Sequence, residues 1–180
     1  MGVMEKDGVD RILEQWAEER PDLDASPMGV FGRLSRAERM LDRSLSETFK
    51  RFGLVRGEFD VLATLRRNGG AYSLTPTELY RSTMLSSGAM TNRLDRLEER
   101  GLVRRSPDPG DRRGVLITLT EEGLDLIEEA VEAHVEGEEE LLDSLGEDDR
   151  EQLAALLRKL LVSMEGAGSA QTTPSGTLRG

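Results

Sequence analysis

The residue types between positions 86 and 113 suit the recognition of nucleic-acid bases and phosphates and not covalent chemistry. If residues 86–100 form a helix at about 100° per residue, Met90, Leu94 and Leu97 share one buried face. The opposite face carries Gly88, Thr91, Asn92, Asp95 and Arg96. Because its N-terminal part is small and polar, this face could approach base edges in a major groove. Ser86 and Ser87 begin the helix, where free N–H groups favour a phosphate; the alternative is an ordinary solvated helix capped by serine.

A second group of charged residues lies in the polar stretch between Pro107 and Gly114. Arg112 and Arg113 could enter a minor groove, and Asp111 could hold the adjacent arginine extended. The alternative is a solvated hairpin loop of mixed charge. The predicted DNA-binding residues are therefore Ser86, Ser87, Gly88, Thr91, Asn92, Arg96, Arg112 and Arg113.

Clear local signals mark the elements that must position these residues. Thr75, Pro76 and Glu78 form a capping box with proline at the first helical position, which predicts a short helix ending near Ser82. The second helix stops at Gly101. The segments VRRS and VLITL are predicted as two strands joined by the eight-residue loop PDPGDRRG. This order predicts a mainly α (α+β) fold with a winged helix-turn-helix.

Helical periodicity continues on both sides of this region. We expect helices over residues 9–19, 30–52, 56–68 and 120–142, and a last helix from residue 148 or 149 to 164. The predicted organisation is an N-terminal helix and loop (1–29), dimer and scaffold helices (30–74), a DNA-binding lobe (75–119), C-terminal dimerisation helices (120–165) and a disordered tail (166–180). The tail is predicted from its small, polar composition.

Composition excludes several classes of protein. The chain has no cysteine and one histidine, His134, so disulfides and zinc sites built from Cys or several His are impossible. No nucleophile–base pair or phosphate-binding loop is present, so we predict no catalytic residue, no metal and no cofactor. No apolar run approaches the roughly 20 residues of a membrane span, and the segment MGVMEKDGVD has neither the basic flank nor the apolar core expected of a signal peptide. We therefore expect a soluble, cytoplasmic protein.

The formal net charge of −11 opposes binding to DNA, but the charge is unevenly distributed. Residues 75–118 contain eight arginines and six acidic residues, whereas residues 119–165 contain three basic and sixteen acidic residues. A near-neutral centre predicts poor non-specific affinity and a dependence on aimed contacts. The acidic segment leaves open an alternative function, an acidic protein-interaction module with a vestigial winged helix that does not bind DNA.

The stretch SSGAMTNRLDRLEERGLVRRSPDPGDRRGVLITLTEEG closely resembles the recognition helix and wing of MarR transcriptional regulators. The D-P-x-D-x-R pattern of that wing matches Asp108, Pro109, Asp111 and Arg113, or Arg112 if shifted by one. The helical frame over residues 30–161 is also similar. The resemblance implies a homodimer that places one recognition helix per subunit in successive major grooves of a pseudo-palindromic operator.

The segments WAEERPDLDASPMGVFGRLSR and GEFDVLATLRR resemble the urate-responsive, PecS-like branch of that family. This resemblance implies four ligand-binding residues, Trp16, Asp60, Arg93 and Arg105. Asp60 lies on the most apolar helix, where a carboxylate needs a partner, and two arginines with a ring suit a flat anion. The alternative is that Asp60 and Arg93 form a structural ion pair and that Trp16 belongs to the core.

We therefore predict a ligand-responsive, sequence-specific DNA-binding regulator, a repressor in type and not an enzyme. Its expected partners are an operator in double-stranded DNA, a second copy of the chain and a small organic anion. By resemblance, urate or a related compound leads the candidates for that anion.

Overall fold

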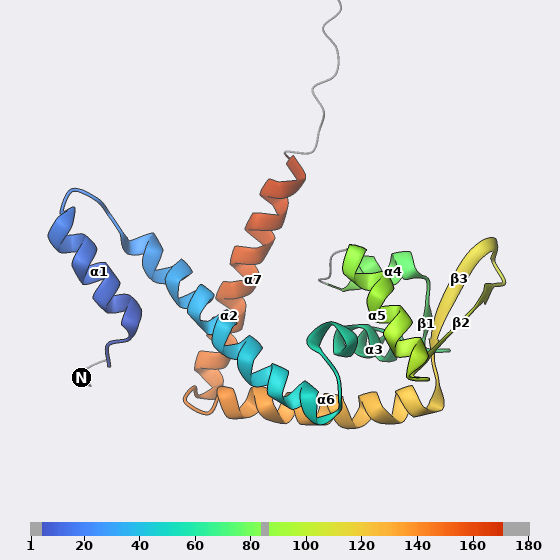
Figure 1. Cartoon of the computed structure of the whole chain (residues 1–180). Helices are drawn as coiled ribbons and strands as arrows, with labels where there is room; N and C mark the ends of the chain where they lie inside the picture. Colours follow the sequence, from blue (N-terminus) through green and yellow to red (C-terminus); the bar gives the residue numbers. More distant parts are fainter. Residues whose placement is uncertain (1–4, 84–86, 171–180) are drawn as a thin grey trace, which may run out of the picture. The chain divides into compact units, whose positions relative to one another are not determined.

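A computed structural model describes residues 5–83 and 87–170 of the chain (Figure 1). The chain forms two compact units, residues 1–138 and 139–180. The elements are α1 (Gly8–Glu19), α2 (Ser26–Arg51), α3 (Arg56–Arg67), β1 (Ser73–Leu74), α4 (Pro76–Ser82), α5 (Ser87–Glu99), β2 (Val103–Asp108), β3 (Asp111–Leu119), α6 (Glu121–Leu141) and α7 (Glu147–Ala170). The predicted winged helix-turn-helix in a mainly helical fold is confirmed.

The first two helices pack together at the N-terminal end of the chain. Asp7 caps α1 by accepting hydrogen bonds from the backbone of Val9 and Asp10. Arg33 of α2 forms salt bridges with both Asp7 and Asp10, which fixes the start of α1 against α2. Helix α2 begins four residues before the predicted start because Pro27 fits the first helical turn.

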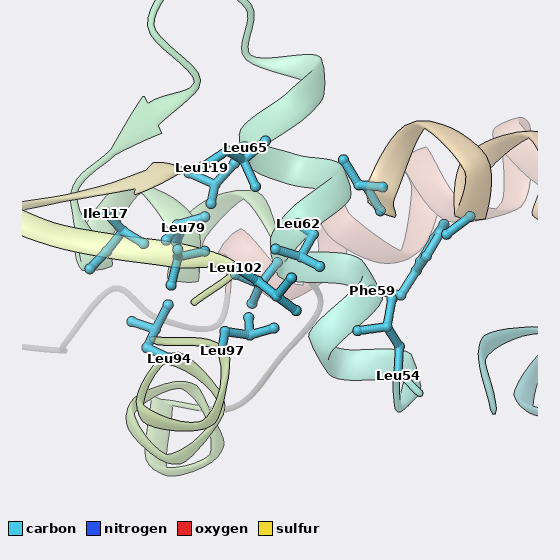
Figure 2. Close-up of a cluster of buried hydrophobic side chains, with 14 of the residues drawn as sticks. Leu54, Phe59, Leu62, Leu65, Leu79, Leu94, Leu97, Leu102, Ile117 and Leu119 are labelled. Atoms are coloured by element: carbon cyan, nitrogen blue, oxygen red, sulfur yellow. The ribbon is translucent and has the colours of Figure 1, made fainter. Parts of the chain in front are cut away.

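Helix α3 forms the centre of the first unit, as its apolar composition predicted. Val61, Leu62 and Leu65 are completely buried. Figure 2 shows the surrounding core residues, which come from α3, α4, α5, the sheet and the connections before α3 and before β2: Leu54, Phe59, Leu79, Leu94, Leu97, Leu102, Ile117 and Leu119. This core holds the short helices α4 and α5 against a common support.

The wing is larger than the sequence predicted. The sheet has the order β1–β3–β2 with antiparallel pairing, and β1, a strand of two residues, was missed. Both long strands extend into the predicted eight-residue loop, so that prediction was wrong. Asp108 pairs with Asp111 across the turn, and a bulge follows Pro107. Cross-strand hydrogen bonding overrides the turn-forming composition of this segment.

The start of α6 is fixed against the end of the recognition helix α5. The Thr120 hydroxyl donates to the Gly101 carbonyl at 2.7 Å and accepts from the Gly123 backbone N–H at 3.0 Å. A Cβ atom on Gly123 would lie 1.9 Å from the carbonyl oxygen of Leu102. Glycine is therefore required at this close approach of two backbones.

The second unit consists of the end of α6 and helix α7. Arg150 donates to the carbonyls of Leu142 and Leu145, which closes the turn between the two helices. Helix α7 continues to Ala170, past residue 166, where a disordered tail was predicted; residues 171–180 lie outside the described part. Exposed apolar residues on α7 are Leu153, Leu156, Leu161, Val162 and Met164. No described helix combines the length and apolar composition of a membrane span.

Candidate nucleic-acid interface and ligand site

The recognition helix α5 exposes the polar face that the sequence predicted. Met90, Leu94 and Leu97 are buried, with at most 4% of each residue exposed. The exposed residues in the middle of the helix are Thr91, Asn92, Asp95 and Arg96. Since these four lie on one side of a helix that is held by its buried side, they form a surface available to DNA.

The N-terminal end of this surface is only partly described. Ser86 lies outside the described residues, and for Ser87 and Gly88 only the helical backbone is described. Their predicted contacts to phosphate and base edges therefore stay predictions. Tyr80 of α4, which sequence reasoning missed, is 44% exposed and lines a hollow of about 260 Å³ next to Thr91. The signal for Tyr80 in the sequence was an aromatic residue on the helix that precedes α5.

The wing presents its arginines to solvent. Arg112 and Arg113 are both exposed, at the start of β3. The carboxylate of Asp111 accepts from the backbone N–H of Arg113 at 2.9 Å, and Asp108 accepts from that of Gly110 at 2.8 Å. These two local bonds shape the turn between β2 and β3 (Figure 1), and both arginines beside it are exposed.

Arg105 on β2 binds the recognition helix instead of facing an open site. Its Nη2 donates to Asp95 at 2.6 Å, and its Nη1 donates to Glu98. Burial opposes the charge on Arg105, but the hydrogen bonds to Asp95 and Glu98 outweigh it and raise the pKa of the guanidinium. At 100° per residue, Asp95 and Glu98 lie about 160° and 140° around α5 from Arg93. Arg105 therefore joins wing and helix on a different side of α5 from Arg93.

Asp60 and Arg93 are brought together, although no salt bridge joins them within the described residues. The Arg93 guanidinium lies on the backbone of Gly57, one helical turn before Asp60. Its Nη1 is buried and has no hydrogen-bond partner. Burial raises the pKa of the Asp60 carboxyl, and the charges of Arg56 and Arg93 only partly oppose that rise. The alternative, a structural ion pair between Asp60 and Arg93, is not among the salt bridges of the described residues, and an unpaired cation lies beside a half-buried carboxylate.

His134 of α6 completes the surroundings of Asp60. Its ring lies 4.8 Å from the ring of Phe59 and 5.5 Å from that of Phe49, measured between centroids. Its Nε2 is 3.3 Å from Glu138, and its Nδ1 is buried without a partner. Sequence reasoning did not place this histidine beside Asp60, because only the packing of α6 on α2 and α3 brings them together.

Trp16 lies far from Asp60 within one chain. Leu13 of α1 contacts Gly29 near the start of α2, whereas Phe49 near its end stacks at 4.3 Å on the residue before Asp60. The 20 helical residues between these two contacts span about 30 Å. Trp16, which is 37% exposed, is therefore too far from Asp60 to contact the same small ligand within one chain.

We expect Asp60 to make stability fall as pH rises. Burial raises the pKa of the Asp60 carboxyl above its ordinary 3.8, so the folded state binds this proton more tightly than the unfolded state. Stability from this group is therefore present at low pH and is lost as pH rises from 3.8 through the folded-state pKa. The Asp60→Asn variant should lack this loss. Urea unfolding of both proteins from about pH 4 to pH 7 measures the difference; identical pH profiles would contradict the burial cost.

Comparisons with known proteins agree with this geometry. Residues 52–114 match the MarR family. The transcriptional regulator PecS of Dickeya dadantii is 46% identical over 152 residues, covering 84% of this chain and 92% of PecS. A crystal structure of mutant MarR from Escherichia coli complexed with operator DNA has a TM-score of 0.66 at 30% identity, covering 87% of this chain and 99% of that chain.

In a third similar protein, a small molecule regulates DNA binding. The solved structure of BpsR from Bordetella bronchiseptica has a TM-score of 0.66 at 30% identity, and it covers 73% of this chain and 91% of that chain. The DNA binding of BpsR is regulated by 6-hydroxynicotinic acid. In both sequence and fold, the chain is similar to proteins that bind DNA.

Proposed function

Because this chain belongs to the MarR family of transcriptional regulators, which bind DNA and are not enzymes, we propose that it is a repressor released from its operator by a small anion. It acts in the cytoplasm as a homodimer on a pseudo-palindromic operator, with one helix α5 per subunit in each of two successive major grooves. Urate or a related compound is the leading effector, by similarity to PecS.

The exposed polar face of α5 supports sequence-specific binding. Asn92 matches the two hydrogen-bonding positions of adenine, and the exposed Arg96 suits guanine or phosphate. The wing arginines add charge beside this face. This arrangement favours a regulator over the alternative of an acidic interaction module, which has no need of an exposed recognition face.

The observation that carries the effector proposal is the unpaired guanidinium of Arg93. A buried donor without a partner costs about 1–3 kcal/mol, which a ligand oxygen would recover. Asp60 beside it accepts hydrogen bonds, so the pair suits a ligand that carries both an anionic oxygen and an N–H group. Urate has both. Tricarboxylate anions lack the N–H group and match this site less well.

Release of DNA requires that the effector bind a DNA-incompetent shape more tightly. A hundredfold loss of DNA affinity corresponds to a coupling of about 2.7 kcal/mol. The bonds from Arg105 to Asp95 and Glu98 hold α5 against the wing. A ligand that binds Arg93 and shifts α5 would therefore strain these bonds. We propose that ligand binding at Arg93 and the Arg105 bonds favour two different positions of α5.

A gel-shift assay on the DNA upstream of the chain's own gene tests the proposal, with and without urate, related purines and tricarboxylates. We expect a retarded band that urate weakens. Selection from random DNA should also enrich an inverted repeat. Absence of any enriched sequence would overturn the operator, and a band that no compound weakens would overturn the effector response.

Two arginines on the same helix should separate the two activities. Arg93→Ala should weaken urate binding at least about tenfold, because it removes a charge-assisted donor, and should keep DNA binding. Arg96→Ala, its matched control, should weaken DNA binding and keep urate binding. Calorimetric titration with urate and gel-shift titration with operator measure the pair. Equal urate affinity in both variants would contradict the role of Arg93.

A further inference from the structure

Gly57 of α3 leaves space that a side chain from another helix occupies. A Cβ atom at this position would lie 2.1 Å from Nε, 2.5 Å from Cζ and 2.8 Å from Cδ of Arg93. Gly57 is itself buried. The guanidinium of Arg93 therefore occupies the space that any other residue would fill with its side chain.

We propose that Gly57 is a positioning residue of the effector site, where it forms a notch that holds the Arg93 guanidinium beside Asp60. This inference rests on the function proposed above. Gly57 and Asp60 are three residues apart and so share one side of α3. The side chain of Arg93 from α5 lies on that side of α3, and its Nη1 is buried without a hydrogen-bond partner.

The neighbours of Gly57 are bonded elsewhere and do not hold Arg93. Arg56 donates to Asp42 of α2 at 2.8 Å. The carboxylate of Glu58 accepts from the backbone N–H of Val55 at 3.1 Å. The position of Arg93 therefore depends on the shape of the notch and on the charge of Asp60, which leaves the guanidinium available to a ligand.

Gly57→Ala should displace the Arg93 side chain and leave the protein folded. The close contacts involve only side-chain atoms of Arg93, so that side chain can turn away while α3 and α5 stay in place. Alanine also favours a helix over glycine. We thus expect an unfolding midpoint equal to or above that of the parent. A glycine needed only for packing would instead give a less stable variant.

The matched control is Gly137→Ala on α6. It makes the same substitution in a helix of the same unit, but its Cβ would meet only Thr48 Oγ1, at the ordinary distance of 3.6 Å. A second control is Gly57→Ala combined with Arg93→Ala. Because this pair lacks the displaced guanidinium, adding Gly57→Ala to Arg93→Ala should change urate affinity no further.

The first measurement needs no ligand. The full chain is treated with phenylglyoxal, which modifies accessible arginines, and the modification of Arg93 is followed by mass spectrometry. We expect several-fold faster modification of Arg93 in Gly57→Ala than in the parent or in Gly137→Ala. Equal rates in all three proteins would overturn the notch.

The second measurement is calorimetric titration with urate. Gly57→Ala should bind urate about tenfold more weakly, as expected for the loss of one charge-assisted hydrogen bond, and Gly137→Ala should bind like the parent. If Arg93 becomes reactive in Gly57→Ala but urate affinity is unchanged, the positioning role is wrong. If the parent itself does not bind urate, the effector assignment is wrong, and the phenylglyoxal rates alone decide the notch.

Discussion

Gly123→Ala is expected to lower the free energy of unfolding by about 3 kcal/mol, because the new methyl group overlaps backbone and not a flexible side chain. The added Cβ would lie 1.9 Å from the carbonyl oxygen and 2.8 Å from the carbonyl carbon of Leu102. Leu102 lies three residues after the end of α5, just before β2, and is buried in the core. The start of α6 must therefore move away from the DNA-binding lobe. Urea unfolding followed by circular dichroism measures the loss.

The control for this experiment is Gly137→Ala, which is a substitution in the same helix with an ordinary contact distance. It should be as stable as the parent or slightly more stable, because alanine favours the helical state. If Gly123→Ala unfolds at the same urea concentration as Gly137→Ala, the close approach of α6 to Leu102 does not exist in solution.

Asn92→Ala and Arg113→Ala should weaken DNA binding in different ways. Asn92→Ala removes a base contact, so we expect a loss of about 1–3 kcal/mol on the preferred operator and relaxed preference at one base position. Arg113→Ala removes a wing charge. It should weaken binding to all sequences and reduce the salt slope by about one. Titrations of specific and unrelated duplexes at several salt concentrations measure both effects.

Arg39→Ala serves as the control for the loss of charge, since Arg39 is an exposed arginine on α2, outside the winged helix. It should leave both sequence preference and salt slope unchanged. If Asn92→Ala and Arg113→Ala also behave like the parent, α5 and the wing do not dock on DNA in the expected orientation.

Several elements could be predicted because their signals lie within a few residues. The capping box of Thr75 and Glu78 places the start of α4 correctly, since the bonding atoms are three positions apart. The spacing of Met90, Leu94 and Leu97 predicts which side of α5 is buried, and therefore which side remains exposed. The predicted strands VRRS and VLITL with the polar segment between them place Arg112 and Arg113 on the hairpin that the structure shows.

The residues predicted to bind a ligand are brought together only in part. Similarity pointed to four residues, but the structure brings only Asp60 and Arg93 together in one chain. Arg105 is bonded to carboxylates on another side of α5, and Trp16 belongs to α1, which packs on the start of α2, whereas Asp60 lies next to its end. Gly57, which accommodates Arg93, had no signal beyond being a glycine in a helical segment.

The sequence by itself determined that the main helices exist, the cap of α4 and the exposed face of α5, because hydrogen bonding and periodicity act between residues a few positions apart. Only the tertiary structure decided which charges meet. Arg93 lies 36 positions after Gly57, and their contact depends on how α5 packs on α3. Such contacts arise from packing among distant segments, which no local pattern encodes.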